Sequence, residues 1–331
     1  MASPRGYIKV RSKPLLYIDN VTKRFGYGFL GRVRFPAVDK VSLALHYEPT
    51  ILTIAGESGC GKTTLARMII GIVEPSEGFV RYKDKDIHKL KSKELLWFRR
   101  EVQAIFQDPY ETFNPMKRVE TYLYESAKNL LGKKDLNQAF EVIDNSLQSV
   151  GLSLGDIRDK YPTEFSGGQL QRISIARALL SQPTLIVADE PVSMIDASMR
   201  MNIINVFKEL KERHGISFIY ITHDLATAYY VSDEIAIMYR GMIVEKGSAE
   251  KVLVGQHHPY TRAMVTSLPE PHKRETWLRV SEAKPTEIEI REFLARGCKY
   301  ANMCPHKFDK CSQRPPVFSV DGVEVSCWLY E

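Results

Sequence analysis

Residues 51–67 read ILTIAGESGCGKTTLAR. The opening ILTIA predicts a short buried strand, and the TLARMII that follows the loop has apolar residues at helical spacing. Between them, residues 56–63 fit the pattern G-x-x-x-x-G-K-[ST] in its required setting, after a strand and before a helix. Backbone N–H groups of such a loop wrap phosphates, and the helix start adds positive partial charge. The stretch predicts a nucleoside triphosphate site.

Two side chains of this loop have expected roles of their own. Lys62 reaches the outer phosphates, and the Thr63 hydroxyl can ligate Mg²⁺. The alternative, a chance glycine-rich loop, fits poorly with the flanking strand and helix. The nucleotide-contacting residues that we expect here are Gly56, Glu57, Ser58, Gly59, Cys60, Gly61, Lys62, Thr63 and Thr64.

The chain's composition is that of a globular protein. It has 331 residues, 44% hydrophobic and 26% charged, with a net charge of +6. This mild excess of positive charge suits ATP or an anionic membrane surface but does not demand nucleic acid. No apolar run approaches the roughly 20 residues that cross a bilayer, and the basic start lacks a secretory signal's apolar centre. We therefore expect a cytosolic chain, held at a membrane only through partners.

The segment before the phosphate loop is expected to form strands with one wet face. Residues 15–25 and 37–47 alternate apolar and polar side chains. Between them, FGYGFLGRVRFP (residues 25–36) is rich in Gly and Arg and predicts a long exposed loop.

A helical insertion is expected in the middle of the chain. Residues 118–131 and 135–150 predict two amphipathic helices, and no strand candidate lies between Phe106 and Leu185. We place the insertion at about residues 108–165. Elsewhere strands alternate with helices, which is typical of a mostly parallel sheet.

The predicted fold class is α/β, with a P-loop (RecA-like) core and a mostly parallel sheet. An N-terminal antiparallel β subdomain, the α-helical insertion and a small irregular C-terminal cysteine domain complete it. The composition changes beyond Gly247, so we predict a nucleotide-binding domain over residues 14–255 and an extension over 256–331.

A second nucleotide motif is LIVADE, residues 185–190. Asp189 ends a buried strand, where an acidic residue usually holds Mg²⁺ through water. Glu190 directly after it can polarise the attacking water as general base. Alternatively both carboxylates cap a helix start, which Pro191 would fit.

Residues 165–169, FSGGQ, resemble the signature of the ATP-binding cassette ATPases, usually LSGGQ. The resemblance covers roughly residues 15–250 and includes the family's other motifs in order. Those motifs fall on Gln107, Asp189, Glu190, residues 193–196 and His223. Phe165 and Met194-Ile195 depart from the usual residues but keep apolar bulk.

The resemblance implies that ATP is shared between two chains. The start of a helix at Ser166, Gly167, Gly168 and Gln169 offers N–H groups to an anion. In the family this second cradle serves the ATP of the facing subunit in a head-to-tail dimer, and Asp196 matches an aspartate at the dimer seam.

The resemblance also assigns three contacts within one chain. Phe25 matches an aromatic that stacks on adenine, with Tyr27 as the second choice and an ordinary strand-end core residue as the alternative. Gln107 matches a glutamine that touches Mg²⁺ or water and opens a loop facing the membrane partner. His223 matches a histidine on the γ-phosphate; otherwise a lone histidine after a strand is usually a core hydrogen-bonder.

Three features resemble the oligopeptide/dipeptide importer branch of this family. They are the Gly/Arg loop before residues 37–39, the block HPYTRA at residues 258–263, and the tail from GCKYANMCPHKFDKC to CWLY. Together they extend the resemblance almost from end to end.

The tail holds four of the five cysteines, Cys298, Cys304, Cys311 and Cys327. Four thiolates can hold an iron–sulfur cluster or a tetrahedral Zn²⁺, and the spacing C-x5-C-x6-C-x15-C does not choose. The resemblance points to a [4Fe–4S] cluster, which some members of the branch carry; Zn²⁺ and free thiols stay open. A disulfide is disfavoured in a reducing cytosol.

The resemblance implies an ATPase subunit that energises a binding-protein-dependent importer of dipeptides and oligopeptides, or of oligosaccharides or nickel. It implies ATP and Mg²⁺ as cofactors, and as partners a second ATPase subunit, identical or sibling, and two integral membrane permease subunits. An extracytoplasmic substrate-binding protein would act indirectly, and the chain would lie peripherally on the cytoplasmic face of the cell membrane. A soluble cassette ATPase acting on nucleic acid or ribosomes is the alternative class, but the coiled-coil insertions or tandem cassettes it needs are missing.

Overall fold

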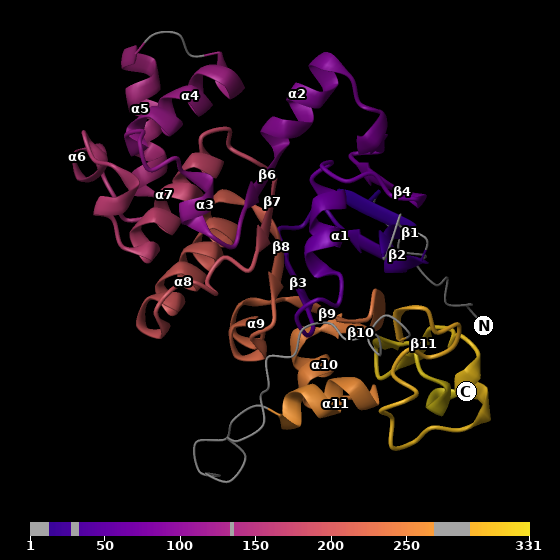
Figure 1. The fold of residues 1–331 in the computed structure, drawn as a ribbon. Helices are drawn as coiled ribbons and strands as arrows, with labels where there is room; N and C mark the ends of the chain where they lie inside the picture. Colours follow the sequence, from indigo (N-terminus) through magenta and orange to yellow (C-terminus); the bar gives the residue numbers. More distant parts are fainter. Residues whose placement is uncertain (1–12, 28–32, 133–135, 268–291) are drawn as a thin grey trace, which may run out of the picture.

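The computed structural model describes residues 13–27, 33–132, 136–267 and 292–331. Its centre is an eight-stranded sheet of order β11-β12-β10-β9-β3-β8-β7-β6 (Figure 1). The five strands from β9 to β6 run parallel, and β10 and the two tail strands are antiparallel. The strands are β3 (Ile51–Ala55), β6 (Val102–Ile105), β7 (Leu185–Asp189), β8 (Ser217–Thr222), β9 (Glu234–Tyr239), β10 (Met242–Ser248), β11 (Phe318–Val320) and β12 (Val323–Val325).

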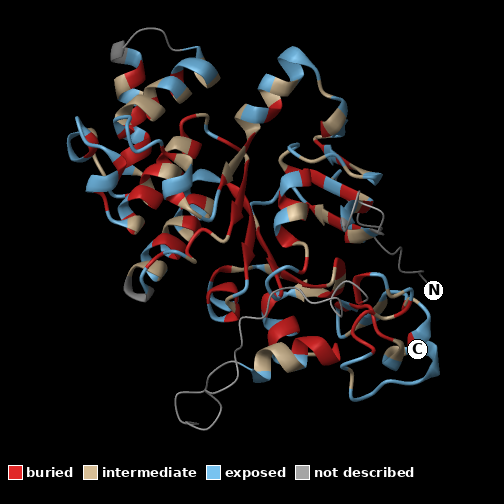
Figure 2. Cartoon of the chain, viewed as in Figure 1, coloured by how far each residue is buried: buried red, intermediate tan, exposed pale blue. Residues whose placement is uncertain are grey.

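Helices cover both faces of this sheet. Strands β3, β7 and β8 are buried at every position, as their continuous apolar runs predict, and form the red centre of Figure 2. In Figure 1, α1 (Lys62–Ile69) lies on one side of the strands, and α7 (Gly167–Leu179) and α8 (Ala197–His214) lie on the other. The remaining core helices are α2 (Ser92–Glu101), α9 (Leu225–Val231) and α10 (Ala249–Gly255).

A second, antiparallel sheet is present, as predicted; two of its strands precede β3 and two follow α1. Its order is β2-β1-β4-β5, from β1 (Leu16–Tyr27), β2 (Val33–Leu45), β4 (Glu77–Tyr82) and β5 (Lys85–Asp86). The predicted long loop over residues 25–36 is wrong for its described part. The β1–β2 ladder continues through Phe25 opposite Phe35 to Tyr27 opposite Val33, because aromatic and β-branched residues favour strands.

The helical insertion is confirmed. Between β6 and α7 the described residues form only helices and turns: α3 (Pro109–Thr112), α4 (Val119–Leu131), α5 (Leu136–Gln148) and α6 (Leu154–Ile157). Leu123, Ile143 and Leu147 are completely buried together with Leu170 of α7. Helical spacing thus gives each helix one apolar face, which packs onto the sheet's outer helices.

The tail contributes to the core. After α11 (Pro259–Thr266), strands β11 and β12 form a hairpin around Asp321-Gly322, both with positive φ, and β12 pairs with β10. Val323 and Val325 are completely buried in one cluster with Ala55 and Ile237. The tail therefore shares a hydrophobic core with the sheet. No helix in the described part of the chain is both long and apolar enough to span a membrane.

Candidate nucleotide-binding site

The phosphate loop follows β3 and runs tightly against two neighbouring strands. A Cβ on Gly56 would overlap the carbonyl oxygen of Met238, and one on Gly61 would overlap that of Ala37. Gly61 also has φ +110°, a conformation that side chains rarely adopt. The loop can therefore follow this path only with glycine at both positions.

Lys62 lies inside the loop and is buried. Its Nζ donates to the carbonyl oxygens of Gly56 and Glu57, both at 2.8 Å, and lies 3.9 Å from Cys60 Sγ. Gly61 begins α1 and supplies no side-chain acceptor to the first-turn N–H groups. Positive charge and helix N–H groups thus converge here, a favourable setting for an anion.

Two acidic residues lie beside this loop: Asp189 ends β7, and Glu190 follows it. The Thr63 hydroxyl donates to Asp189 Oδ1 at 3.2 Å. Burial raises the pKa of Asp189, and this hydrogen bond partly offsets the effect. A hydroxyl and a carboxylate are the hard oxygen donors that Mg²⁺ prefers, so these residues fit the predicted ion.

Glu190 pairs with His223, which follows β8. Nδ1 of His223 lies 3.2 Å from Glu190 Oε2. The hydrogen bond lowers the pKa of Glu190 and raises that of His223. Because β7 and β8 are neighbouring parallel strands, their carboxyl ends bring the two side chains together.

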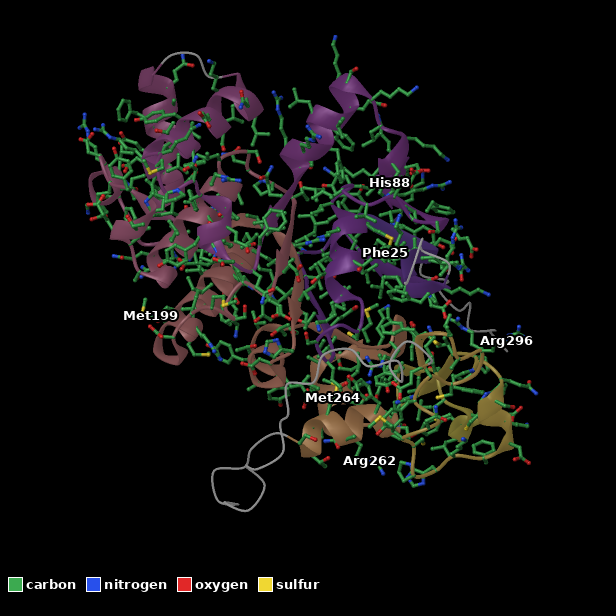
Figure 3. All side chains as sticks on the ribbon, in the orientation of Figure 1. Phe25, His88, Met199, Arg262, Met264 and Arg296 are labelled. Carbon is green, nitrogen blue, oxygen red and sulfur yellow. The ribbon has the colours of Figure 1, made fainter. Side chains whose placement is uncertain are left out.

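The Glu190–His223 pair and the start of the phosphate loop line a cavity of about 620 Å³. From the sequence-predicted set it is lined by Gly56, Glu57, Ser58, Gln107, Glu190 and His223. The rest of its lining comes from residues to which the sequence analysis gave no role. Among them are Leu225, Tyr260 and Met264, of which Figure 3 labels Met264. Tyr260 belongs to the HPYTRA block, the one sequence feature that could have pointed to its place in the site.

The predicted signature lies elsewhere in the chain. Ser166 caps α7: Gln169 N donates to Ser166 Oγ at 3.3 Å, and Ser166 N donates to Gln169 Oε1 at 3.0 Å. Figure 1 places α7 across the strands from α1, and no described residue from 166 to 169 lines the cavity. The Tyr110 hydroxyl donates to Phe165 O at 3.1 Å, which ties the signature to α3. Exposed Asp196 begins α8.

The predicted adenine contact lies on β1. The Phe25 ring is 39% exposed, with Lys23 Nζ 5.6 Å from its centroid, on the same side of the core strands as α1 (Figure 3). An exposed ring is free to stack, unlike the core residue considered as the alternative. The side chain of Tyr27 is outside the described residues.

The four tail cysteines are free thiols, two buried and two half-buried. Cys298 N donates to Cys311 O at 3.0 Å, and burial raises the pKa of Cys298 to about 11. Within the described ranges, no three or more His, Cys, Asp or Glu side chains form a group that could hold a metal ion. The predicted [4Fe–4S] cluster, or Zn²⁺, on Cys298, Cys304, Cys311 and Cys327 is therefore not supported.

Known proteins resemble this chain in sequence and fold. Residues 38–193 match the family model ABC transporter, and residues 244–311 match Oligopeptide/dipeptide transporter, C-terminal region. The putative oligopeptide transport ATP-binding protein YkfD of Bacillus subtilis is 37% identical over 97% of both chains. The oligopeptide transport ATP-binding protein OppF of Escherichia coli is 38% identical over 85% of this chain and 84% of its own.

Two solved structures share the fold. The dimeric ATP-binding cassette MJ0796 bound to ADP and Pi has a TM-score of 0.62 at 26% identity, over 71% of this chain and 98% of its own. The ADP form of the cassette MJ1267 has the same score at 27% identity, over 77% and 99%. The chain belongs to the ABC transporter family, among its oligopeptide and dipeptide transport ATP-binding proteins.

Proposed function

We propose that this chain hydrolyses ATP to drive import of dipeptides and oligopeptides through separate membrane subunits. The observation that carries the proposal is the convergence of Lys62, the Thr63–Asp189 pair and the Glu190–His223 pair on one loop. The peptide substrate is taken from the relatives' names.

Binding would use the loop and the start of α1. The phosphates displace Lys62 from the carbonyl oxygens of Gly56 and Glu57 and take the N–H groups that Gly61 leaves uncapped. Thr63, with Asp189 and Gln107, would hold Mg²⁺, which when bound neutralises phosphate charge. Phe25 would stack on adenine.

Hydrolysis would use the Glu190–His223 pair. Glu190 has a lowered pKa, so it is ionised near neutral pH and can take a proton from the attacking water. His223 orients this carboxylate through its Nδ1 and, with nucleotide present, turns toward the γ-phosphate.

The site is half of a larger one in this proposal. Residues 166–169 lie across the strands from α1, so they would serve the ATP of a second subunit, identical or sibling. The similar cassette MJ0796 is dimeric in its ADP-bound structure, which supports a dimer here. Exposed Phe106, Tyr110 and Met116 around Gln107 offer apolar contacts to two membrane permease subunits at the cytoplasmic face. We keep residues 14–255 as the nucleotide-binding domain and 256–331 as an extension docked on it; a metal cluster is not part of the proposal.

The test compares the wild-type chain with Glu190→Gln; Glu212→Gln, at an exposed position of α8, is the control. We expect Mg-dependent ATP hydrolysis that falls about 10²–10⁴-fold in Glu190→Gln. ATP binding is retained in that variant, and light scattering detects an ATP-dependent dimer. Near-normal hydrolysis in Glu190→Gln would contradict the assigned base.

The substrate is tested separately. The chain, assembled with its membrane subunits and binding protein in vesicles, should take up labelled dipeptide when ATP is supplied. Uptake of an oligosaccharide or nickel instead of peptide would reassign the substrate and leave the ATPase assignment intact.

A further inference from the structure

The C-terminal segment reaches the phosphate loop directly. Tyr260 of α11 is 1% exposed, and its hydroxyl oxygen accepts a hydrogen bond from the Glu57 N–H at 3.2 Å. Glu57 is the second residue of the loop, and its carbonyl oxygen also accepts from Lys62 Nζ. A displacement of Glu57 would therefore move the amine that is to meet the phosphates.

The structure holds Tyr260 firmly. Its N–H donates to His258 Nδ1 at 3.0 Å, and the N–H groups of His257 and His258 each donate to Glu245 of β10 at 3.0 Å. Burial lowers the pKa of His258 to about 4, so the imidazole stays a neutral acceptor. The start of α11 is thereby fixed on the core sheet.

The ring of Tyr260 is fixed as well. It packs against Tyr239 of β9 and Tyr300 of the tail, with centroids 4.5 and 5.5 Å away. Burial raises the pKa of Tyr260, which keeps the phenol neutral. Its position is set by neighbours on both sides, so the hydroxyl is presented to Glu57 in one place.

A second route from the tail ends on the other part of the loop. Cys60 O accepts from Gly241 N at 2.8 Å, and Gly241 O accepts from Asp39 N at 2.8 Å. The Asp39 carboxylate is in turn paired with Lys299 at 2.9 Å and Arg314 at 3.1 Å. Two cations of the tail thus hold the strand on which the loop rests.

Both cations also bind backbone beside the loop. Lys299, whose side chain is 2% exposed, donates to Arg240 O at 3.0 Å, next to Gly241. Arg314 Nη2 donates to Asp39 O at 2.9 Å. Moving Lys299 away from these partners would leave its buried charge unpaired, which is strongly destabilising. The contact is therefore expected to be rigid.

We propose that residues 257–267 and 292–331 act as a brace that positions the phosphate-binding loop, with Tyr260 as the positioning residue. The inference rests on the proposed nucleotide binding. It follows from two routes of hydrogen bonds that fix Glu57 and Cys60 before a ligand arrives, because a loop already in place loses less conformational entropy on binding.

The experiment compares Tyr260→Phe with a matched variant, Tyr239→Phe, in the full chain. Both substitutions keep the ring and remove a hydroxyl, but the Tyr260 hydroxyl accepts from the Glu57 N–H of the loop, whereas the Tyr239 hydroxyl donates to Met303 Sδ at 3.8 Å. Calorimetric titration with a nonhydrolysable ATP analogue and Mg²⁺ measures affinity. In Tyr260→Phe we expect Kd and KM for ATP to rise about three- to tenfold, the equivalent of one lost hydrogen bond. The kcat at saturating ATP changes less, and Tyr239→Phe keeps the wild-type Kd.

A second measurement distinguishes a local change at the loop from poor folding of the whole variant. Hydrogen exchange of the peptide spanning residues 56–60 should be faster in Tyr260→Phe than in Tyr239→Phe, while the peptide of β8 exchanges equally in both. Equal Kd values in all three proteins, or equal weakening in both variants, would overturn the brace and leave ATP binding intact. Failure of the wild-type chain to bind the analogue would instead refute the proposed function, on which the brace depends.

Discussion

Two helices begin at glycine-rich segments, α1 at residues 56–63 and α7 at residues 166–169, but their first N–H groups have different partners. At α1, Gly61 offers no side-chain acceptor, and the first-turn N–H groups are left for a ligand. At α7, Ser166 and Gln169 already hydrogen-bond each other's backbone N–H groups. Similar composition thus yields one start without a side-chain cap and one in which the N–H groups of Ser166 and Gln169 are already paired within the chain.

Alanine at one glycine of each start should give the largest contrast. In Gly61→Ala the new Cβ overlaps Ala37 O, and residue 61 must also keep its φ of +110°. We therefore expect ATP binding to fall below detection and the free energy of unfolding to drop by about 2 kcal/mol or more. In Gly168→Ala the nearest atom, Met199 Cε, is 3.5 Å away, an ordinary contact. The Kd for ATP from calorimetry and the Tm of the monomer should therefore equal the wild-type values in Gly168→Ala but not in Gly61→Ala. Equal damage from both variants would remove the contrast.

Removing the amine from the first start should weaken binding next. Lys62→Ala leaves the phosphates without their buried cation, so the Kd for ATP should rise roughly 30-fold or more. Lys89→Ala, at a side chain 83% exposed, serves as control and should bind ATP as wild type does. A Kd within about threefold of wild type for Lys62→Ala would mean that the loop's N–H groups alone carry the phosphate contact.

Removing the cap of the second start should separate stability from turnover. Ser166→Ala loses an N-cap worth about 1 kcal/mol. Ser153→Ala, directly before α6 and away from both starts, loses the hydrogen bond from Ser153 Oγ to Asp156 Oδ2 at 2.7 Å. Both variants should melt slightly earlier and bind ATP normally as monomers, but only Ser166→Ala should reduce ATPase turnover. A comparable loss of turnover in Ser153→Ala would assign the effect to stability.

The smallest expected effect is a pKa shift beside the first start. The Glu190 hydrogen bond raises the pKa of His223, so in Glu190→Gln it should fall back toward about 6.5. The ion pair of protonated His223 and ionised Glu190 stabilises the fold at pH values between the lowered pKa of Glu190 and the raised pKa of His223. This stability is lost as pH falls through the first pKa or rises through the second. NMR titration of the imidazoles measures the shift. His88, whose pKa burial lowers, is the internal control and should not move; an unchanged His223 would refute the pairing.

Sequence alone predicted the parts of the site that depend on local pattern. The phosphate loop and the acidic pair at the end of β7 belong to strands whose apolar runs are unambiguous, whereas His223 after β8 was assigned only by the family resemblance. Their meeting required only that β7 and β8 be neighbours, which parallel topology provides. The loop predicted over residues 25–36 was wrong for residues 25–27 and 33–36, because glycine and arginine content outweighed the strand preference of Phe25, Tyr27, Val33 and Phe35.

The contribution of the tail was not predictable in the same way. The contact of Tyr260 with Glu57 depends on Glu245, on His258 and on an aromatic cluster, which come from separate parts of the chain. The hairpin at Asp321-Gly322 did have a local signal, the Asp-Gly pair between alternating residues, but the cysteine spacing drew attention to metal chemistry instead.

The pairing of β12 with β10 also has a consequence for solubility. Without the tail, β10 would be the outermost strand of the sheet, with the backbone groups of Glu245 and Lys246 unpaired beside an apolar patch. Such an open edge invites pairing with other chains. With the tail in place the sheet ends in strands of only three and four residues, β11 and β6. We therefore expect chains shortened before β11 to aggregate more than the full chain, which sedimentation of the two proteins would measure.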